Sequence, residues 1–544
     1  MICIKRIEGT VPINREVLIV GGGLNGLTTA LLLAHHGVEC LVVERHPNTS
    51  IQYKFAGISP RSMEIFRSLG IEEEIRAKRT GDQQAGGVAR GKNLADPAIE
   101  WMRPHAWPDI NGLSPTPPAT CDQHVLEPIL RAHAERLGAD VRFNTELVSF
   151  VQDGEVRALI RNRETGEEQE VQAAYLIGAD GANGTTREAV GIARNGPGVL
   201  QHWMNIIFDT DLPPAVQGKR FTSCFLTEIN GTFTPRENGR WLLALQYFPE
   251  RDESPEDFDD DRCRVLVRRG AGRADVKADL VDARSWEVAA LIAGRFREGR
   301  VFLVGDSAHL MPPTGAFGGN TGIHDAQNLA WKLAAVLQGR ADPALLDSYD
   351  RERRPVAETS LEQALTRLQA WFKDPNKRLP PPVPLVDDYD VVFGHLYHTG
   401  AVMTEGETAG RAFAKARELS GQPGSRAPHL VIEHYGRRMS TLDLFNKDFV
   451  LLTGAAGTAW CEAALAIADR RPYNLQCYRI GSGGDLVDLE NRWPVAYGVT
   501  ESGAVLVRPD GFVAWRSRDC PSQPSRVLRD VFARIGLRIP FETC

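Results

Sequence analysis

Residues 16–26 read Glu-Val-Leu-Ile-Val-Gly-Gly-Gly-Leu-Asn-Gly, and this stretch decides the fold of the N-terminal part of the chain. The apolar run at 17–20 predicts a strand that enters a glycine-rich turn. Residues 27–36 are rich in Ala and Leu, and a second apolar run at 40–43 ends in Glu44. Strand, glycine turn, helix and strand in this order predict one βαβ unit of about thirty residues. No second fingerprint of this kind follows a strand in the sequence, so we expect one dinucleotide-binding fold.

Three glycines of this turn have the spacing G-x-G-x-x-G. Gly21 allows the tight turn, Gly23 lets a pyrophosphate approach the backbone, and Gly26 lets the helix pack closely on the strand. Glu44 stands at the end of the next strand, where a carboxylate can accept hydrogen bonds from ribose hydroxyls. The turn by itself fits NAD or FAD.

Two further strand ends narrow the choice of cofactor. Residues 174–181 predict a strand that ends at Asp180, and residues 301–309 predict another that ends at Asp306. The chain then passes through a glycine-rich stretch into a helix that we expect over 321–337. An Asp at a strand end can hold a ribityl hydroxyl, and glycines let a flat ring lie against the backbone. The free N–H groups and the dipole of the helix suit the negative charge of a reduced flavin.

The composition of the 544-residue chain is that of a globular protein, with 42% hydrophobic and 24% charged residues. The formal net charge of −7 gives no reason to expect nucleic acid as a partner. No apolar run approaches the roughly 18 residues of a membrane span, and basic residues interrupt the short apolar stretches of residues 1–15. We therefore expect a cytoplasmic protein without a signal peptide or membrane contact, as a monomer or a homodimer.

The nine cysteines form no CxxC pair and have no metal-ligand spacing. They predict reduced thiols, as in a cytoplasm, and neither a disulfide framework nor a zinc site. We expect no dithiol redox chemistry in the C-terminal part, where Trp460 and Cys461 are predicted to be packing residues. The cysteines are Cys3, Cys40, Cys121, Cys224, Cys263, Cys461, Cys477, Cys520 and Cys544.

The predicted fold class is α/β, with several units along the chain. Residues 195–300 contain β-rich stretches separated by turns, and prolines at 380–384 mark a stiff linker. Short strands and helices alternate again beyond residue 425. We predict a Rossmann-like dinucleotide-binding domain in two parts with an inserted β-sheet substrate domain, followed by a small α/β domain. The ranges are 14–195 and 299–400 for the first domain, 196–298 for the insert and 401–544 for the last.

Together these motifs resemble the FAD-dependent aromatic hydroxylases of the p-hydroxybenzoate hydroxylase type, a family of single-component flavoprotein monooxygenases. Residues 305–333, GDSAHLMPPTGAFGGNTGIHDAQNLAWKL, are close to the strongest signature of that family. Other matching segments are 58–64, 123–128 and 349–355, while 426–429, 440–445 and 507–516 look like the thioredoxin-like tail of the larger members. The segments 208–212, 231–233 and 284–287 resemble actinobacterial aromatic polyketide hydroxylases.

The resemblance implies non-covalent FAD, NADPH or NADH as a transient reductant, and O2 as the oxidant. It implies that one oxygen atom enters a polycyclic phenolic polyketide through a C4a-hydroperoxyflavin. Because the cofactor carries this chemistry, we expect no Ser-His-Asp or metal constellation and name no catalytic side chain. His309, in the signature, is expected to be a structural histidine.

The residues expected at the cofactor come from the three motifs and from the matching segments. They are Gly21, Gly23, Leu24, Asn25, Gly26, Glu44, Arg45, Lys54, Gln123, Asp180, Asp306, Pro313, Gly315, Gly318, Gly319, Asn320 and Thr321. Three positions depart from the family pattern. Lys54 replaces an Arg near the flavin ring, which leaves the mobility of the flavin open. Gly184 replaces a small hydroxyl residue, and Ala316 replaces a Gly.

Substrate contacts are expected from the β-rich insert. The aromatic and polar candidates are Ser223, Phe225, Phe233, Arg240, Gln246, Tyr247 and Trp286. Side chains alternate along a strand, so about half of such a set points away from any pocket, and the sequence does not choose the inward half.

Three other functions remain open at this point. Within the same family, the substrate could be a phenol, a chlorophenol or a hydroxypyridine. A flavin-binding scaffold could protect a reactive intermediate without oxidising it. An NAD-dependent dehydrogenase is disfavoured by the Gly-Asp pair at 305–306.

Overall fold

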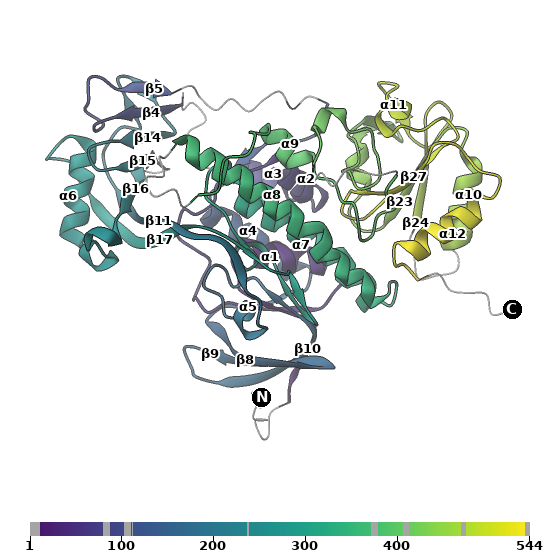
Figure 1. Ribbon diagram of the computed structural model, residues 1–544, viewed down its shortest axis with the longest axis horizontal. Coiled ribbons are helices and arrows are strands. Elements are labelled where there is room, and N and C mark those ends of the chain that lie inside the picture. The colour runs from purple at the N-terminus through teal and green to yellow at the C-terminus, as the bar shows by residue number, and fades with distance from the viewer. Residues whose placement is uncertain are drawn as a thin grey trace.

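The computed structural model describes residues 11–79, 87–102, 110, 112–236, 239–371, 379–405, 413–468 and 475–538. Figure 1 shows a central part built mainly by the N-terminal half of the chain, a second sheet on its left and the C-terminal part, in yellow, on its right. Each part is built on its own sheet, so the predicted α/β class with an inserted sheet is confirmed.

The central sheet has the strand order β18-β19-β10-β1-β2-β7, and the β8–β9 hairpin pairs with β10. Its core of five strands is parallel, as a βαβ unit requires. The apolar runs of β1 and β2 are buried because helices or hairpins cover both faces of such a sheet. The strands are β1 (Ile13–Val20), β2 (Cys40–Val43), β7 (Asp140–Arg142), β8 (Thr145–Asp153), β9 (Glu155–Asn162), β10 (Glu168–Gly178), β18 (Arg297–Glu298) and β19 (Val301–Leu303).

Three helices pack on one face of the central sheet in a common hydrophobic cluster: α1 (Leu24–His35), α4 (Gln123–Arg136) and α7 (Phe317–Leu337). The end of α7 agrees with the predicted helix, but its beginning is at Phe317 and not at Thr321. Ala316 has a left-handed backbone (φ 55°) and turns the chain into the helix before the glycines. The N-terminus of α1 follows β1, and α7 follows β19 and a short loop. Both N-termini therefore lie at the carboxyl edge of the parallel sheet.

The second sheet is mostly antiparallel, with the order β20-β17-β11-β16-β15-β14-β4-β5. Helix α6 (Asp260–Ala271) covers one face of it, where Val267 and Ala271 join the cluster of buried strand residues. The other face is turned toward α8 (Asp347–Trp371), whose Leu368 packs against Trp203 and Val288. The strands are β4 (Val88–Gly91), β5 (Glu100–Met102), β11 (Arg194–Asp209), β14 (Ser223–Leu226), β15 (Gly231–Pro235), β16 (Arg240–Tyr247), β17 (Asp279–Ala293) and β20 (His309–Leu310).

Three strands of the second sheet come from outside the predicted insert 196–298. β20 belongs to the range predicted for the second part of the first domain and pairs with β17. β4 and β5 are formed by residues 88–102, which the sequence assigns to the first domain. β4 pairs with β14 in parallel, and β5 pairs with β4 as the outer edge. Strands this short, so far from their partners in sequence, have no pattern that identifies the sheet they join. The predicted domain boundaries stay a prediction, to which this excursion has to be added.

The C-terminal part contains a four-stranded sheet, β24-β23-β26-β27, in which β23 and β24 are parallel and the other pairs are antiparallel. With α10 (Thr458–Ala468) and α12 (Pro524–Arg534) this is the predicted thioredoxin-like arrangement. Trp331 of α7 lies in the hydrophobic cluster of this domain, which attaches it to the central part. The strands are β23 (Phe449–Gly454), β24 (Leu475–Ile480), β26 (Ala504–Val507) and β27 (Val513–Ser517).

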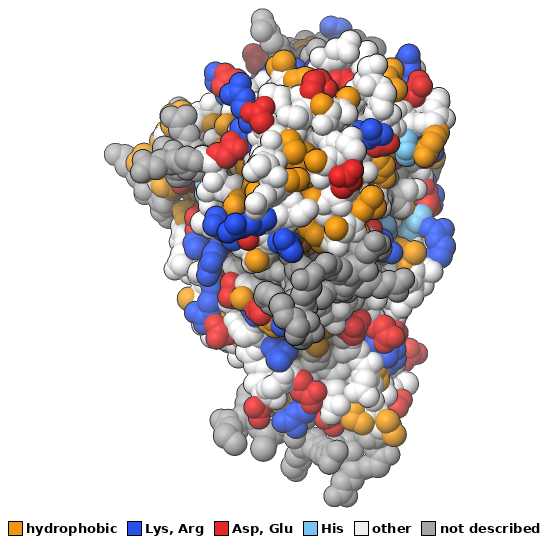
Figure 2. Space-filling model, turned by 90° about the vertical axis from the view of Figure 1, so that its right-hand side faces the viewer, with side chains coloured by type: hydrophobic (Ala, Val, Ile, Leu, Met, Phe, Trp, Pro, Cys, Tyr) orange, Lys and Arg blue, Asp and Glu red, His pale blue; other side chains and the backbone are white. Residues whose placement is uncertain are grey.

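The surface on the side of the C-terminal domain carries basic, acidic and hydrophobic side chains interspersed with one another (Figure 2). In the part of the chain that the structure describes, no helix combines the length and the apolarity that crossing a bilayer requires.

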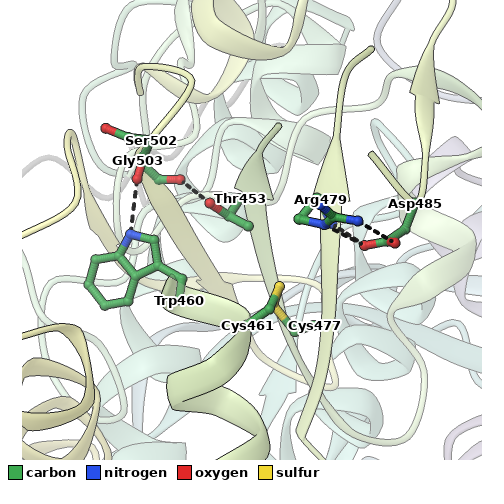
Figure 3. The surroundings of a disulfide bond; sticks show 8 residues. All are labelled: Thr453, Trp460, Cys461, Cys477, Arg479, Asp485, Ser502 and Gly503. Carbon is green, nitrogen blue, oxygen red and sulfur yellow. Dashed lines mark hydrogen bonds and ion pairs between the residues drawn. A yellow bond between two sulfur atoms is a disulfide. The ribbon is translucent and has the colours of Figure 1, made fainter. Parts of the chain in front are cut away.

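The prediction that all cysteines are reduced is wrong for one pair. Cys461 in α10 and Cys477 in β24 form a disulfide, with Cα atoms 5.5 Å apart and a sequence separation of 16 (Figure 3). The pair escapes a search for CxxC because helix and strand, not sequence proximity, bring the two sulfurs together. Trp460 is fully buried, as predicted for a packing residue. Cys3 and Cys544 lie outside the described residues.

Candidate functional site

The glycine turn after β1 has the geometry that its spacing predicts. Gly21 has a left-handed backbone (φ 109°), and a Cβ at this position would collide with the carbonyl of Ala179. A Cβ on Gly26 would collide with the carbonyl of Gly21, whereas a Cβ on Gly23 would meet nothing nearer than Glu127 Oε1 at 3.6 Å. Gly21 and Gly26 therefore serve the turn and the packing. Gly23 leaves its side of the turn open for a phosphate group at the N-terminus of α1.

Glu44 lies at the end of β2 beside this turn. Its carboxylate accepts hydrogen bonds from the backbone N–H of Gly22 (2.7 Å) and of His46 (2.9 Å). A Cβ on Gly22 would press against the Glu44 side chain, at 2.8 Å from its Cβ, so this fourth glycine makes room for the carboxylate. The His46 ring, whose Nδ1 lies 2.6 Å from Oε1, and the two backbone donors orient the group and leave a lone pair on Oε2 for a ribose hydroxyl. Arg45, the next residue, is exposed.

Asn25 carries an acceptor that no described protein group satisfies. Its Oδ1 atom is buried and has no hydrogen-bond partner. The side chain fits between Gly305 and Gly322, where a Cβ on either glycine would collide with it. A buried acceptor without a donor is costly, and a ligand bound at the junction of the α1 and α7 motifs would relieve this cost by supplying the donor.

Asp180 and Asp306 follow adjacent strands but have different surroundings. Asp180 accepts hydrogen bonds from Ser307 Oγ and from the backbone N–H of Thr186, both at 2.9 Å. It therefore joins the two strand-end turns, and each of its carboxylate oxygens already accepts one hydrogen bond. A Cβ on Gly184 would collide with the Asp180 carboxylate, which explains this departure from the family pattern.

Asp306 is the carboxylate that is available to a ligand. Its side chain is accessible to solvent, yet the protein around it desolvates the group and raises the pKa of its carboxyl. The position at the end of β19 is the one predicted for a contact with ribityl hydroxyls.

The first turn of α7 offers an open backbone. A Cβ on Gly318 would meet nothing nearer than Met311 Cβ at 3.9 Å, so a flat ring can approach here. The other glycine of the pair is closed, since a Cβ on Gly319 would press against the Phe55 ring. Gly315 (φ 89°) and Ala316 (φ 55°) are both left-handed, so Ala at 316 is accommodated with some backbone strain.

Asn320 holds the two segments of this region together. Its Oδ1 accepts hydrogen bonds from Ser59 N (2.9 Å) and Ser62 Oγ (2.7 Å). Its Nδ2 donates to the carbonyls of Gly57 (2.9 Å) and Ala316 (2.8 Å). Asn320 and the buried Thr321 can thus reach a cofactor only through the backbone N–H groups of the first helical turn.

The remaining predicted cofactor residues lie around the same edge. Leu24 is buried at the start of α1, and Lys54 and Pro313 are exposed. Gln123 Nε2 donates to Glu127 Oε1 (2.6 Å), and burial raises the pKa of Glu127. Glu127 beside Gly23 belongs to the site but is missing from the predicted set, although its segment matches the family.

His309 is fully buried in β20, with its Nε2 atom 2.7 Å from Asp325 Oδ2. Asp325 also accepts a hydrogen bond from Arg353 Nε (2.8 Å). This buried chain stabilises the turn that carries Asp306, which agrees with a structural histidine.

The second sheet sorts the seven substrate candidates onto its two faces. Residues of β14, β15 and β16 that are paired across the strands share a face, so Phe225 lies with Thr232 and Ala244, and Gln246 lies with Trp203 and Trp286. This is the face turned toward α8. The candidates on it are Ser223, Phe225, Arg240, Gln246 and Trp286.

Phe233 and Tyr247 lie on the opposite face. Both are buried in the hydrophobic cluster under α6, and a Cβ on Gly270 of that helix would come within 2.9 Å of the Phe233 ring. The structure does not bring these two residues to the face shared by the other five.

Aromatic rings line the face toward α8. Trp286 stacks on Trp203, with centroids 5.9 Å apart and an interplanar angle of 26°. Trp286 Nε1 donates to Asn205 Oδ1 (2.9 Å), which fixes the orientation of the indole. Trp203 and Asn205 are missing from the predicted set, because only the register of β11 with β17 brings them beside Trp286.

The segment before Lys54 is attached to the second sheet. Arg236 lies over the ring of Tyr53, with its Cζ 4.7 Å from the centroid, and donates to Asp122 (3.1 Å). Arg240 contacts Tyr53 as well and forms a two-fold ion pair with Asp209 (2.8 and 3.0 Å). Burial raises the pKa of the Tyr53 hydroxyl. The segment that contains Lys54, which is expected at the cofactor, therefore lies next to the second sheet that carries the aromatic face.

Comparison with known proteins gives matches over most of the chain. Residues 14–364 match the family model described as FAD binding domain, and residues 420–535 match the one described as aromatic-ring hydroxylase, C-terminal. Tetracenomycin A2 monooxygenase-dioxygenase of Streptomyces glaucescens is 39% identical, over 96% of this chain and 97% of the relative. 4-Methyl-5-nitrocatechol 5-monooxygenase of a Burkholderia species is 38% identical, over 98% of this chain and all of the relative.

A solved structure agrees with the fold as a whole. The crystal structure of a ternary complex of aklavinone-11 hydroxylase with FAD and aklavinone is 36% identical. It has a TM-score of 0.88 and covers 97% of this chain and 100% of that chain. The open glycine turn, the unsatisfied Asn25 acceptor and the open backbone at Gly318 are consistent with FAD as the cofactor. The chain therefore belongs to the family of FAD-dependent aromatic-ring hydroxylases.

Proposed function

We propose that the protein uses NAD(P)H and O2 to hydroxylate a flat, polycyclic phenolic compound of the polyketide type. Substrate, O2, NAD(P)H and a proton yield the hydroxylated product, NAD(P)⁺ and water. The observation that carries the proposal is the aromatic face of the second sheet, where Trp286 stacks on Trp203 next to the cofactor edge. The named substrates of the Streptomyces relatives support the same class.

The cofactor would be held by groups from both N-terminal helix motifs. Gly23 and the N-terminus of α1 would receive the pyrophosphate, Glu44 a ribose and Asp306 the ribityl chain. The open backbone at Gly318 would lie against the flavin ring, with Lys54 nearby. When bound, FAD supplies the activation of oxygen, so these residues only bind and orient.

The face toward α8 would bind the substrate. Trp286 presents an indole on which fused rings can stack, and Gln246 and Ser223 offer polar groups on the same face. Arg240 lies on the same face, but its charge is paired with Asp209, so we assign stabilisation of the phenolate form of a substrate hydroxyl to no side chain. A phenolate ring is richer in electrons at the neighbouring carbon atoms, which is what hydroxylation needs.

A smaller phenol is the second candidate substrate. The Burkholderia relative, named for its action on a nitrocatechol, is 38% identical over nearly the whole chain. Sequence identity therefore does not separate the two substrate classes. The two stacked indoles of Trp203 and Trp286 favour the polycyclic substrate over the monocyclic phenol.

We also propose that the nicotinamide binds only transiently, since one dinucleotide fold is present, and that the protein works in the cytoplasm, where NAD(P)H is available. The exposed Arg45 offers no defined site for a 2′-phosphate, so NADPH and NADH are tested side by side.

The experiment compares flavin reduction and product mass with different ligands. A tetracyclic hydroxyquinone is expected to accelerate NADPH oxidation at least about tenfold, a barrier change of about 1.4 kcal/mol, and to gain one oxygen atom. A monocyclic phenol or nitrocatechol should do much less. A reversed order would establish the smaller substrate class. Equal reduction rates with every aromatic compound and no gain in mass would contradict hydroxylation and indicate a scaffold.

A further inference from the structure

A disulfide lies at the edge of the C-terminal sheet, away from the FAD site. Cys461 is at the end of the first turn of α10, and Cys477 is on β24, the edge strand of the four-stranded sheet. Both residues are partly exposed. Figure 3 shows the sulfur atoms between the helix and the strand. Because both cysteines are partly exposed, reagents in solution can approach this bond.

The free cysteines of the described residues have different surroundings. Cys40, Cys121, Cys224 and Cys263 are buried, and only Cys520 among them is partly exposed. Burial raises the pKa of the Cys40 and Cys224 thiols to about 12. Such thiols are inert as nucleophiles. Among the described cysteines, the disulfide therefore differs from the four buried thiols, because it is partly exposed and can react with a thiol from solution.

Hydrogen bonds of buried residues fix helix α10 and strand β23 next to the disulfide. Trp460, next to Cys461, is buried and donates from Nε1 to the carbonyl of Ser502 (3.0 Å). Thr453 at the end of β23 donates to the carbonyl of Gly503 (2.6 Å). Helix α10 thus keeps a fixed position on the sheet through Trp460, and the disulfide joins its exposed side to β24.

The ion pair between Arg479 and Asp485 lies in the surroundings of the disulfide (Figure 3). Arg479 is two residues beyond Cys477 and therefore on the same side of β24. It forms an ion pair with Asp485 (3.2 Å) and stays partly exposed. A position near the N-terminus of a helix, such as that of Cys461 in α10, favours a thiolate over a thiol. Cys461 is therefore the sulfur that we expect to leave when the bond opens.

We propose that Cys461–Cys477 is a thiol–disulfide exchange site that a dithiol reductant opens and that exchange with a disulfide oxidant, which is itself reduced to the dithiol, closes again. One thiolate of the dithiol attacks Cys477 Sγ on the exposed edge strand. The Cys461–Cys477 bond breaks, Cys461 leaves as a thiolate and takes a proton. The second thiol of the reductant then attacks the mixed disulfide, releases Cys477 and closes the reductant's own disulfide. Two electrons and two protons pass from the dithiol to the cysteine pair.

Opening the bond would loosen α10 from β24 without touching the FAD site. Trp460, Ala463 and Ile467 of α10 lie in the hydrophobic cluster that also contains Trp331 of α7. The effect should therefore appear in the stability of the C-terminal domain. The proposal concerns this domain alone and does not depend on the proposed hydroxylation.

The test begins by counting alkylated cysteines in the native full-length holoprotein before and after treatment with dithiothreitol. We expect two further alkylated residues, identified by peptide mapping as Cys461 and Cys477, and their loss again after reoxidation. The thermal midpoint of the C-terminal domain should fall by about 5 °C on reduction, because a cross-link closing a short loop is lost. FAD content should stay unchanged.

Variants provide the matched controls. Cys461→Ser with Cys477→Ser should have the low midpoint already, and dithiothreitol should not lower it further. Cys520→Ser, which changes a partly exposed cysteine outside the pair, should keep the response to dithiothreitol. Reactive thiols at Cys461 and Cys477 before any reduction, or a pair that dithiothreitol opens only after denaturation, would overturn the proposal.

Treatment with glutathione, a monothiol, tests which of the two sulfurs is attacked. Brief treatment should leave the mixed disulfide on Cys477, because this is the sulfur proposed to be attacked. A mixed disulfide found on Cys461 would overturn the assigned direction.

Discussion

Arg508 of the C-terminal domain donates two hydrogen bonds, each 2.8 Å long, to the carboxylate of Glu352 in α8, and both side chains are completely buried. Lys332 of α7 donates to the same carboxylate (2.8 Å), and Asp510 pairs with Arg508 from the other side. Buried charges are costly unless each is paired. This cluster therefore holds the thioredoxin-like domain against α7 and α8 in one defined position.

Replacing one charged residue of this buried cluster should destabilise the protein strongly. Arg508→Met leaves Asp510 without its cationic partner and should lower the free energy of unfolding by about 3–5 kcal/mol. Denaturant unfolding followed by fluorescence measures this. Lys415→Met is the control, since the Lys415–Glu418 pair is exposed, and it should cause no measurable change. Equal stability of the two variants would contradict a stabilising role for the buried cluster.

The same cluster should make stability depend on pH. Burial alone would raise the pKa of Glu352, but Arg508 and Lys332 outweigh it and lower this pKa from 4.5 to about 2. The folded protein thus holds the ionised carboxylate more strongly than the unfolded chain does. The resulting stabilisation is complete above about pH 4.5 and is lost as the pH falls toward 2. Thermal midpoints measured between pH 6 and 3 should decrease, and a flat profile would contradict this assignment.

Asp306 and Asp180 should respond differently to replacement by Ala. Asp306→Ala should weaken FAD retention roughly tenfold or more, because a charged hydrogen bond contributes about 1.5–3 kcal/mol. The stability of the apoprotein should hardly change. Glu44→Ala should also release FAD, with some loss of stability, because Glu44 binds two backbone N–H groups.

Asp180→Ala is the matched comparison and should lower the thermal midpoint of the apoprotein, since Ser307 and Thr186 lose their acceptor. Flavin content after dialysis and apoprotein melting separate the two effects. Full flavin occupancy in both Asp306→Ala and Glu44→Ala would refute the proposed binding residues.

Trp286→Ala should raise the KM for a polycyclic substrate roughly tenfold, equal to about 1.4 kcal/mol, through the loss of stacking surface. The kcat should change less. Tyr247→Phe is the control, because Tyr247 lies on the opposite face under α6, and its KM should equal that of the wild type. Steady-state kinetics with the substrate identified in the mass assay provide the measurement. A higher KM for Tyr247→Phe than for Trp286→Ala would place the substrate elsewhere.

The parts of the site that a sequence predicts well are those set by backbone geometry. Gly21 and Gly26 are required by contacts within one βαβ unit, so local spacing reveals them. Asp180 shows the limit of this reasoning. Its strand-end position is the same as that of Asp306, but hydrogen bonds to Ser307 and Thr186 give it a different task.

Local sequence patterns do not predict which face of a sheet a residue lies on, nor which distant segments of the chain pair with each other. Phe233 and Tyr247 differ from Phe225 and Gln246 only in strand parity, and parity acquires a meaning once α6 covers one face. The strands formed by residues 88–102 lack such a pattern altogether. The Cys461–Cys477 bond depends on the packing of a helix against a strand, which no spacing rule in the sequence describes.

The excursion of residues 88–102 into the second sheet has a consequence for engineering. A chimaera that exchanged only the contiguous insert for that of a relative would join β14 of one protein to β4 of the other. Pairing and packing at this seam would then be mismatched, and the graft would be expected to misfold for reasons unrelated to substrate contacts. An exchange of the substrate sheet in this chain therefore requires that residues 88–102 be replaced together with the insert.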